Sequence, residues 1–287
     1  MGDSLPTSHC LMDLAPPDIR WFLDRSDIVL IPMGSCEQHG AHLPLGTDTI
    51  TALEVAKRAA HIADVPYTAP LWAGYSPQHM REPESAVGTI TLRASTLNEV
   101  LYDIARSLIH HGWNKLIFVN GHGSNVKVVD SLLRRIRYET GAFVAFYKPY
   151  AERYLGFLTD ILENPPNETP GWHASELETS QVLAHDATLV RMDRAVDTRA
   201  HVPEWLPASF AKKDGAPDVE FKGYQYFTFP MDHGEFTQTG VIGNPFRATA
   251  AKGEEALNRF ARHLAEAIEE FRPLRVQIKR RVFEDRV

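Results

Sequence analysis

Residues 28–48 have the sequence IVLIPMGSCEQHGAHLPLGTD, in which an apolar run is followed by a polar loop interrupted by glycine and proline. The run Ile28–Met33 is typical of a strand buried on both faces, as in a parallel sheet covered by helices. The loop then carries four side chains of types that bind metals or move protons: Glu37, His39, His42 and Asp48. This stretch predicts a strand whose carboxyl end bears a functional site.

The rest of the chain alternates between strand and helix patterns. Further strands are expected over residues 67–71, 89–92, 115–119 and 142–147. Helices are expected over about 11–26, 48–63, 97–111, 125–139, 173–185 and 248–271. This order predicts an α/β layered fold. We expect a single domain over residues 1–287, with a partly irregular segment at 201–245 that lies over one edge of the core.

Composition excludes several classes of protein. The net charge of −7, with no Lys/Arg-rich block before the extreme C-terminus, argues against a nucleic-acid partner. No apolar run approaches the ~18 residues needed to span a bilayer. The start of the chain lacks the basic and apolar regions of a signal peptide, and there are only two cysteines. We therefore expect a cytoplasmic protein without a membrane partner.

Two loops follow buried strands, and their side chains converge if those strands are neighbours. In an extended segment Glu37 and His39 point to the same side, and Asp48 can face them from the start of a helix. After the strand at 115–119, His122 lies between two glycines. Carboxylate and imidazole together suit Zn²⁺, Mn²⁺ or Fe²⁺. The alternative is that Glu37 forms a loop salt bridge and Asp48 only caps its helix.

A third candidate segment begins at His173. Helical spacing pairs His173 with Glu176, three residues on, and turns Glu178 away by about 140°. The alternative is that both acids merely stabilise the first turn of the helix. His79, in a polar loop, is a candidate for contacting substrate, whereas His233 could rim the pocket or reach a neighbouring subunit.

Together the segments 34–48, 87–92, 120–125 and 173–180 resemble the creatininase (creatinine amidohydrolase) family, in its order and approximate spacing. The resemblance implies a three-layer α/β/α sandwich with a mostly parallel central sheet, assembled into hexamers, with two divalent metal ions per subunit. By motif position, Glu37 and His122 would bind one metal, His39 the other, and Asp48 both. Glu178, rather than the Glu176 chosen by spacing, would be a further ligand or would support one.

The resemblance also implies a role for His173 and a change of substrate. His173 matches the catalytic histidine of the family. Ser124 stands where the namesake enzyme has a metal-binding glutamate, and Trp172 is directly adjacent to His173. Both positions are candidates for contacting substrate, and both departures indicate a substrate other than creatinine.

The implied function is that of a metal-dependent hydrolase. A metal-bound hydroxide would attack a carbonyl of a small polar substrate, a cyclic or acyclic amide, while His173 moves a proton toward the leaving group. One alternative is a hydrolase that opens a cyclic keto-polyol such as 3-dehydro-scyllo-inosose. A second is a non-catalytic binding or assembly protein on a degenerate enzyme fold, which the serine at position 124 keeps open.

Overall fold

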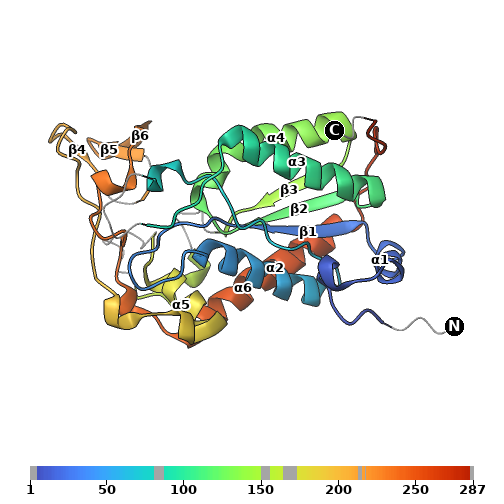
Figure 1. Ribbon diagram of the computed structural model, residues 1–287, viewed down its shortest axis with the longest axis horizontal. Helices are drawn as coiled ribbons and strands as arrows, with labels where there is room; N and C mark the ends of the chain where they lie inside the picture. Colours follow the sequence, from blue (N-terminus) through green and yellow to red (C-terminus); the bar gives the residue numbers. More distant parts are fainter. Residues whose placement is uncertain are drawn as a thin grey trace.

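The computed structural model describes residues 5–80, 87–149, 156–163, 173–212, 215–216 and 218–284. Its central sheet consists of three parallel strands in the order β1 (Ile28–Met33), β2 (Lys115–Asn120) and β3 (Phe143–Tyr147). Every residue of β1 and β2 is buried, as expected for apolar strands covered on both faces. The three carboxyl ends therefore lie at the same edge of the sheet (Figure 1).

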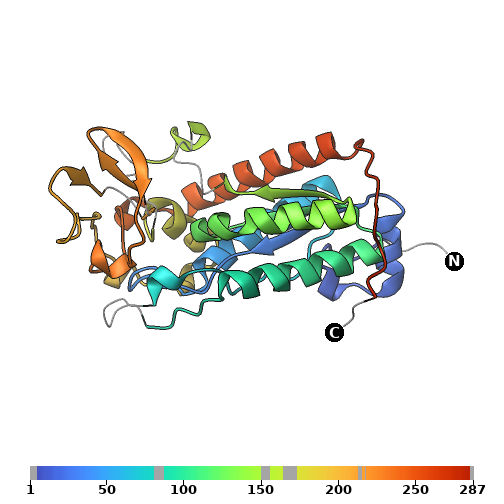
Figure 2. The same cartoon turned by 90° about the horizontal axis from the view of Figure 1, so that it is seen from above.

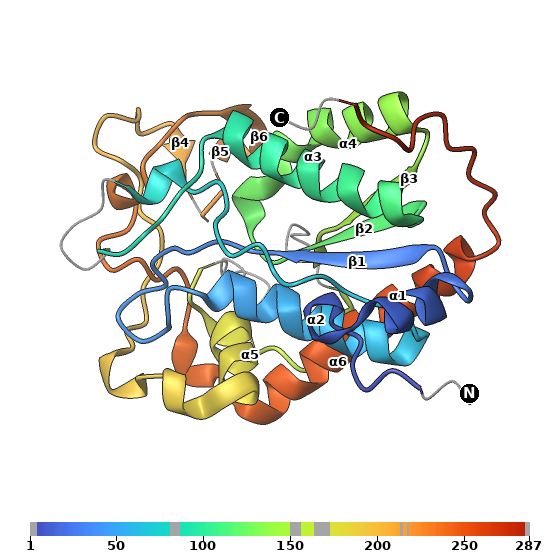
Figure 3. The same cartoon turned by 45° about the vertical axis from the view of Figure 1, so that its right-hand side comes forward.

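Helices cover both faces of this sheet. The helices α2 (Thr47–Ala63), α5 (Glu176–Asp186) and α6 (Ala250–Phe271) lie on one side. The helices α3 (Ala94–His111) and α4 (Val126–Thr140) lie on the other, and α1 (Pro16–Leu23) packs beside them. Figure 2 shows α3 and α4 side by side across the sheet, and Figure 3 shows the sheet between the two layers. The fold is a three-layer α/β/α sandwich.

The alternation of side chains along β1 explains why both layers form. Ile28 and Leu30 belong to the apolar cluster shared with α2 and α6. Val29 and Ile31 belong to the cluster shared with α3 and α4. Because successive residues of a strand point to opposite faces, an uninterrupted apolar run binds a helix layer on each side.

Most predicted elements match the structure to within a few residues, and the differences have local causes. The predicted helix over 11–26 is shortened to a 3₁₀ turn at Leu11–Asp13 and α1, because Pro16 can start a helix but cannot continue one. The segment 67–71 runs parallel to β1 through isolated bridges only, and Pro70 has no N–H to extend the ladder. The segment 89–92 likewise forms bridges at Ile90 and Thr91 rather than a strand.

A second, small sheet lies beyond the carboxyl ends of the central strands (Figure 1). It is antiparallel and contains β4 (Phe210–Ala211), β5 (Asp218–Phe221) and β6 (Tyr224–Thr228). Lys222 and Gly223 connect β5 to β6 with φ angles of 51° and 88°, the left-handed pair that a two-residue hairpin loop requires. This sheet lies within residues 201–245 and has a small apolar core of its own.

In the described part of the chain, no helix combines the length and apolarity needed to cross a bilayer.

Candidate metal centre

Five side chains from four parts of the chain meet at the carboxyl edge of the central sheet. The loop after β1 supplies Glu37 and His39, and the loop after β2 supplies His122. Asp48 lies in the first turn of α2, and Glu178 lies in the first turn of α5. They meet because Met33 and Asn120, the last residues of β1 and β2, are paired neighbours.

Two glycines allow the strand ends to approach α2 this closely. A Cβ atom at Gly121 would lie 2.0 Å from the backbone oxygen of Asp48, and one at Gly34 would lie 2.4 Å from the backbone nitrogen of Thr49. Any side chain at either position would push the start of α2 away from the sheet.

The first group of potential ligands consists of Glu37, Asp48 and His122. His122 Nδ1 lies 3.0 Å from Asp48 Oδ2 and 3.4 Å from Glu37 Oε1. The second group consists of His39, Asp48 and Glu178. His39 Nε2 lies 3.2 Å from Asp48 Oδ1 and 3.7 Å from Glu178 Oε2. Asp48 thus directs its two oxygens at two different imidazoles, and in each group the potential ligand atoms lie within 4.8 Å of one another.

Hydrogen bonds on the far side of each imidazole determine which nitrogen faces the group. His39 Nδ1 donates to the backbone oxygen of Glu37 at 3.2 Å, and His122 Nε2 donates to that of Tyr75 at 3.0 Å. The opposite nitrogens, His39 Nε2 and His122 Nδ1, therefore face carboxylate oxygens. A positive charge must lie between each nitrogen and its carboxylate, either a second ring proton in the metal-free protein or a metal ion in its place.

The buried polar atoms of the cluster fit a divalent cation. Glu37 Oε2, His39 Nε2 and Asp48 Oδ2 are fully buried, and apart from the imidazole–carboxylate contacts given above they have no hydrogen-bond partner among the described residues. Leaving such atoms unsatisfied is costly, and bound ions are a usual explanation. Oxygen and imidazole nitrogen ligands suit Zn²⁺ and Mn²⁺.

The pKa shifts of the side chains in the cluster also favour positive charge at this site. Burial by itself lowers the pKa of His39, but Asp48 and Glu178 outweigh it and raise that pKa well above its usual range. Burial also lowers the pKa of His122, and there Glu37 and Asp48 raise it well above its usual range. Burial raises the pKa of Glu37, but His122 and His79 hold it well below its usual range. The carboxylates therefore stabilise positive charge in both groups.

His173 approaches this cluster from just outside α5. It forms a bridge with Ile242, and its Nε2 donates to the backbone oxygen of Gln38 at 2.7 Å. Its Nδ1 lies 3.9 Å from Glu37 Oε1. Burial, together with the nearby His39, lowers the pKa of His173 well below its usual range, so this imidazole is neutral at pH 7.

The backbone after His173 explains why the acid that helical spacing selects is not the one that faces His39. Ala174 has a left-handed φ of 56°, and α5 begins only at Glu176, so His173 is not part of the helix. Glu176 is buried and pairs with Lys252 at 2.7 Å, which is a structural contact. Glu178 is the acid that faces His39.

Two more histidines lie in this centre. His79 Nε2 lies 3.5 Å from Glu37 Oε1, and the His79 and His233 rings are 4.3 Å apart. Both are buried, so His233 belongs to the interior of its own subunit. The sequence left the role of His233 open, and the role of Gln38 was missed. The only signal for Gln38 is its position between Glu37 and His39.

The other candidates lie at the margin or outside the described residues. The Ser124 hydroxyl accepts a hydrogen bond from Gln78 at 2.8 Å and belongs to neither ligand group. His42 bonds Thr179, and burial, with the nearby His39, lowers its pKa to about 4. Trp172 lies outside the described residues.

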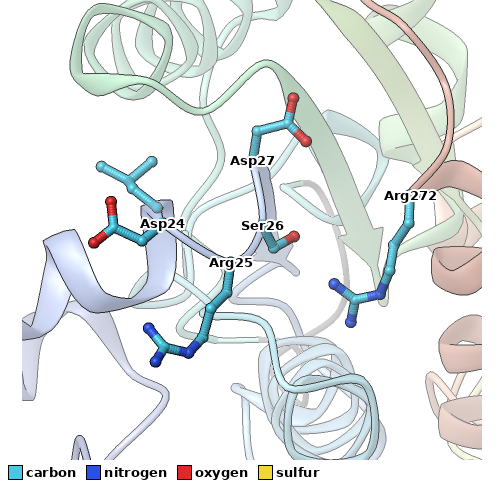
Figure 4. A pocket seen from close by; sticks show the side chains of 6 residues that line it. Asp24, Arg25, Ser26, Asp27 and Arg272 are labelled. Carbon is cyan, nitrogen blue, oxygen red and sulfur yellow. The ribbon is translucent and has the colours of Figure 1, made fainter.

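A separate hollow near the start of β1 is not a second candidate for the functional site (Figure 4). Several of its polar side chains are engaged in structural contacts: Asp27 pairs with Lys115 at 3.0 Å, and Arg272 pairs with Glu269 at 2.8 Å. Arg25 donates to the backbone oxygen of Trp21. These contacts hold the chain at the amino edge of the sheet.

Curated relatives of this chain include several hydrolases. It is 31% identical to creatinine amidohydrolase of Pseudomonas putida over 86% of this chain and 90% of that protein. It is 32% identical to mycofactocin precursor peptide peptidase of Mycobacterium tuberculosis over 79% of each. It is 26% identical to 3-dehydro-scyllo-inosose hydrolase of Thermotoga maritima over 92% of this chain and 83% of that protein.

Solved structures agree with these relatives. A mutant creatininase of Zn-Zn type matches with a TM-score of 0.71 and 28% identity, over 94% of this chain and all of that one. A manganese form of creatininase matches with a TM-score of 0.69 and 28% identity, over 93% of this chain and all of that one. The family model described as creatinine amidohydrolase matches residues 12–268. This chain belongs to the creatininase family of metal-dependent hydrolases.

Proposed function

We propose that this protein hydrolyses a small polar amide at a centre that holds two divalent ions. Glu37, Asp48 and His122 would hold one ion, and His39, Asp48 and Glu178 the other. The observation that carries the proposal is that the two oxygens of Asp48 face different imidazoles, 3.2 Å and 3.0 Å away. The bound ions would supply Lewis-acid polarisation of a carbonyl and would lower the pKa of water to about 7.

His173 would transfer the proton. It is buried and neutral, and its Nε2 is committed to the backbone oxygen of Gln38. The remaining nitrogen, Nδ1, is on the side of Glu37 and can accept a proton and pass it to the leaving nitrogen of an amide. His173 is paired with neither Asp48 nor His122, but its Nδ1 lies 3.9 Å from Glu37 Oε1 and its ring stacks on that of His39 at 4.2 Å. The metal content of a His173 variant must therefore be measured alongside its activity.

An amide is the preferred substrate class because the relatives at 31% and 32% identity are named as an amidohydrolase of creatinine and a peptidase of a precursor peptide. The rival substrate is a cyclic keto-polyol, in line with the name of the Thermotoga maritima relative. The hydrogen-bonded pair Gln78 and Ser124 favours this rival, because an amide and a hydroxyl near His122 suit a ligand rich in hydroxyl groups.

Chelation, reconstitution and two substrate panels test the proposal. Chelated protein should lose activity toward a panel of small amides and short peptides, and regain it with Zn²⁺ or Mn²⁺. Hydrolysis of cyclic keto-polyols instead would select the rival. His173→Gln should abolish turnover while the metal content, measured by mass spectrometry, stays equal to wild type. Activity that survives complete chelation would overturn the metal-dependent mechanism.

We also propose that the protein is a cytoplasmic homo-oligomer, a hexamer by its likeness to the family. Two free thiols, Cys10 and Cys36, support a reducing compartment. Light scattering during gel filtration would measure the mass, and a monomer at micromolar concentration would contradict the assembly.

A further inference from the structure

Gln38 lies among three histidines of the centre, and its side chain is buried. Its Nε2 is 3.4 Å from His79 Nδ1, 3.3 Å from His173 Nε2 and 3.2 Å from His233 Nδ1. The backbone N–H of Gly40 donates to Gln38 Oε1 at 2.9 Å. Because that N–H must meet an oxygen, the amide can have only one orientation, with its NH₂ group toward the imidazoles.

Counting hydrogens then assigns the tautomers of all three rings. The NH₂ group has two hydrogens for three nearby nitrogens. His173 Nε2 already donates to the backbone oxygen of Gln38 at 2.7 Å, so it carries a hydrogen and cannot accept another. The two hydrogens of the amide therefore go to His79 Nδ1 and His233 Nδ1. Both rings must be unprotonated at Nδ1 and carry their hydrogen on Nε2.

We propose that Gln38 is a positioning residue that fixes the tautomers of this histidine cluster. Its main-chain oxygen holds His173 in the Nε2–H form, which leaves Nδ1 as the nitrogen that exchanges protons. Its side-chain amide holds His79 and His233 in the same form, which directs the Nε2–H of His79 at Glu37 Oε1, 3.5 Å away. The inference rests on the proposed role of His173.

A close backbone approach supports this role. A Cβ atom at Gly240 would lie 1.9 Å from Gln38 Oε1, and Gly240 has a left-handed φ of 72°. The chain that follows His233 therefore packs directly on the amide, and only glycine permits it. The backbone at Gly240 confines the amide, and the N–H of Gly40 determines that its oxygen points away from the imidazoles.

Nitrogen-15 spectra of histidine-labelled, Zn²⁺-loaded protein test the proposal without any substrate. These spectra separate protonated from unprotonated ring nitrogens, and His79→Gln and His233→Gln variants assign the signals. In the wild type we expect His79, His173 and His233 all to be protonated at Nε2. A proton on Nδ1 of His79 or His233 in the wild type would overturn the assignment.

Gln38→Glu gives the decisive comparison. A carboxylate still accepts from the N–H of Gly40 but offers only acceptors to the imidazoles. His79 and His233 should therefore each carry a hydrogen on Nδ1, whereas His173, held by a main-chain oxygen, should not change. Gln38→Met, which removes the donors and adds no acceptor, should raise the fraction of His79 and His233 that is protonated at Nδ1 above that of the wild type.

Gln78→Glu is the matched control, since it introduces the same charge one residue from His79 without facing these rings. It should leave all three tautomers as in the wild type at equal zinc content. A Gln38→Glu spectrum identical to wild type, or one in which all three histidines change together, would refute the positioning role. Loss of hydrolysis cannot imitate either result, so failure here is distinct from failure of the proposed function.

Discussion

Loading the metal-free protein with Zn²⁺ at pH 7 should release about two protons per subunit, because ligands must lose their protons to bind. Neighbouring carboxylates raise the pKa values of His39 and His122 well above the usual range, so both rings are protonated at pH 7 without metal. Glu37 contributes no proton, because its pKa is held well below its usual range. Glu178, whose pKa is raised by burial, can add a fraction.

The sign of the pH dependence follows from the same shifts. A raised histidine pKa means that protons compete with the metal until the pH passes that raised pKa. Each ion is paired with one of these histidines, so its apparent affinity should rise about tenfold, or about 1.4 kcal/mol, per pH unit from neutral pH upward. The affinity should become constant only above the raised pKa.

Calorimetric titration of chelated protein in buffers of different ionisation enthalpy measures the proton count directly. His39→Gln should lower it by about one, because one imidazole no longer exchanges a proton for metal. The exposed His111 supplies the control, and His111→Gln should leave the count unchanged. Binding without proton release in the wild type would refute the electrostatic reasoning, as would an unchanged count in His39→Gln.

Four further substitutions test separate parts of the structure. Asp48→Ala should remove both ions, whereas Glu178→Gln should weaken only one, as measured by metal content after gel filtration; one remaining ion in Asp48→Ala would contradict a shared ligand. Lys252→Met should lower the free energy of unfolding by about 3 kcal/mol, because it leaves buried Glu176 without its ion-pair partner, and urea titration at fixed metal concentration measures this. Gly253→Ala should lower the free energy of unfolding by about 1–3 kcal/mol in the same titration, because its Cβ would lie 1.9 Å from a backbone oxygen of α5. An unfolding midpoint equal to that of the wild type would show that α6 can move away from α5 without cost.

The three-layer sandwich could be predicted because its central strands are indicated by their own residues, without reference to distant parts of the chain. Ile28–Met33 is apolar at every position, and such a run is typical of a strand covered on both faces. Segments whose structure depends on their neighbours were predicted less well. Residues 67–71 have strand composition, but Pro70 limits them to isolated bridges beside β1.

Residue spacing alone predicted one half of the candidate centre and failed on the other. Glu37 and His122 could be brought together because they follow two parallel strands, whose carboxyl ends must share an edge. Glu178 could not be chosen by periodicity, because that choice assumes a helix already formed at His173. The left-handed Ala174 delays the helix, and the alanine itself gives no sign of this conformation.

The histidines around Gln38 show why a complete site is harder to predict than a metal cluster. His233 is separated from Gln38 by 195 positions, and it reaches the amide through an edge segment with a core of its own. Nothing in that segment has the periodicity of a core element, and its approach depends on the absence of a side chain at Gly240. The carboxyl edge of the central sheet supplies the side chains that could bind metal, and the segment 201–245 packs over them. Ligand chemistry can therefore be inferred from strand ends, whereas the tautomers that proton transfer requires depend on a contact between distant parts of the chain.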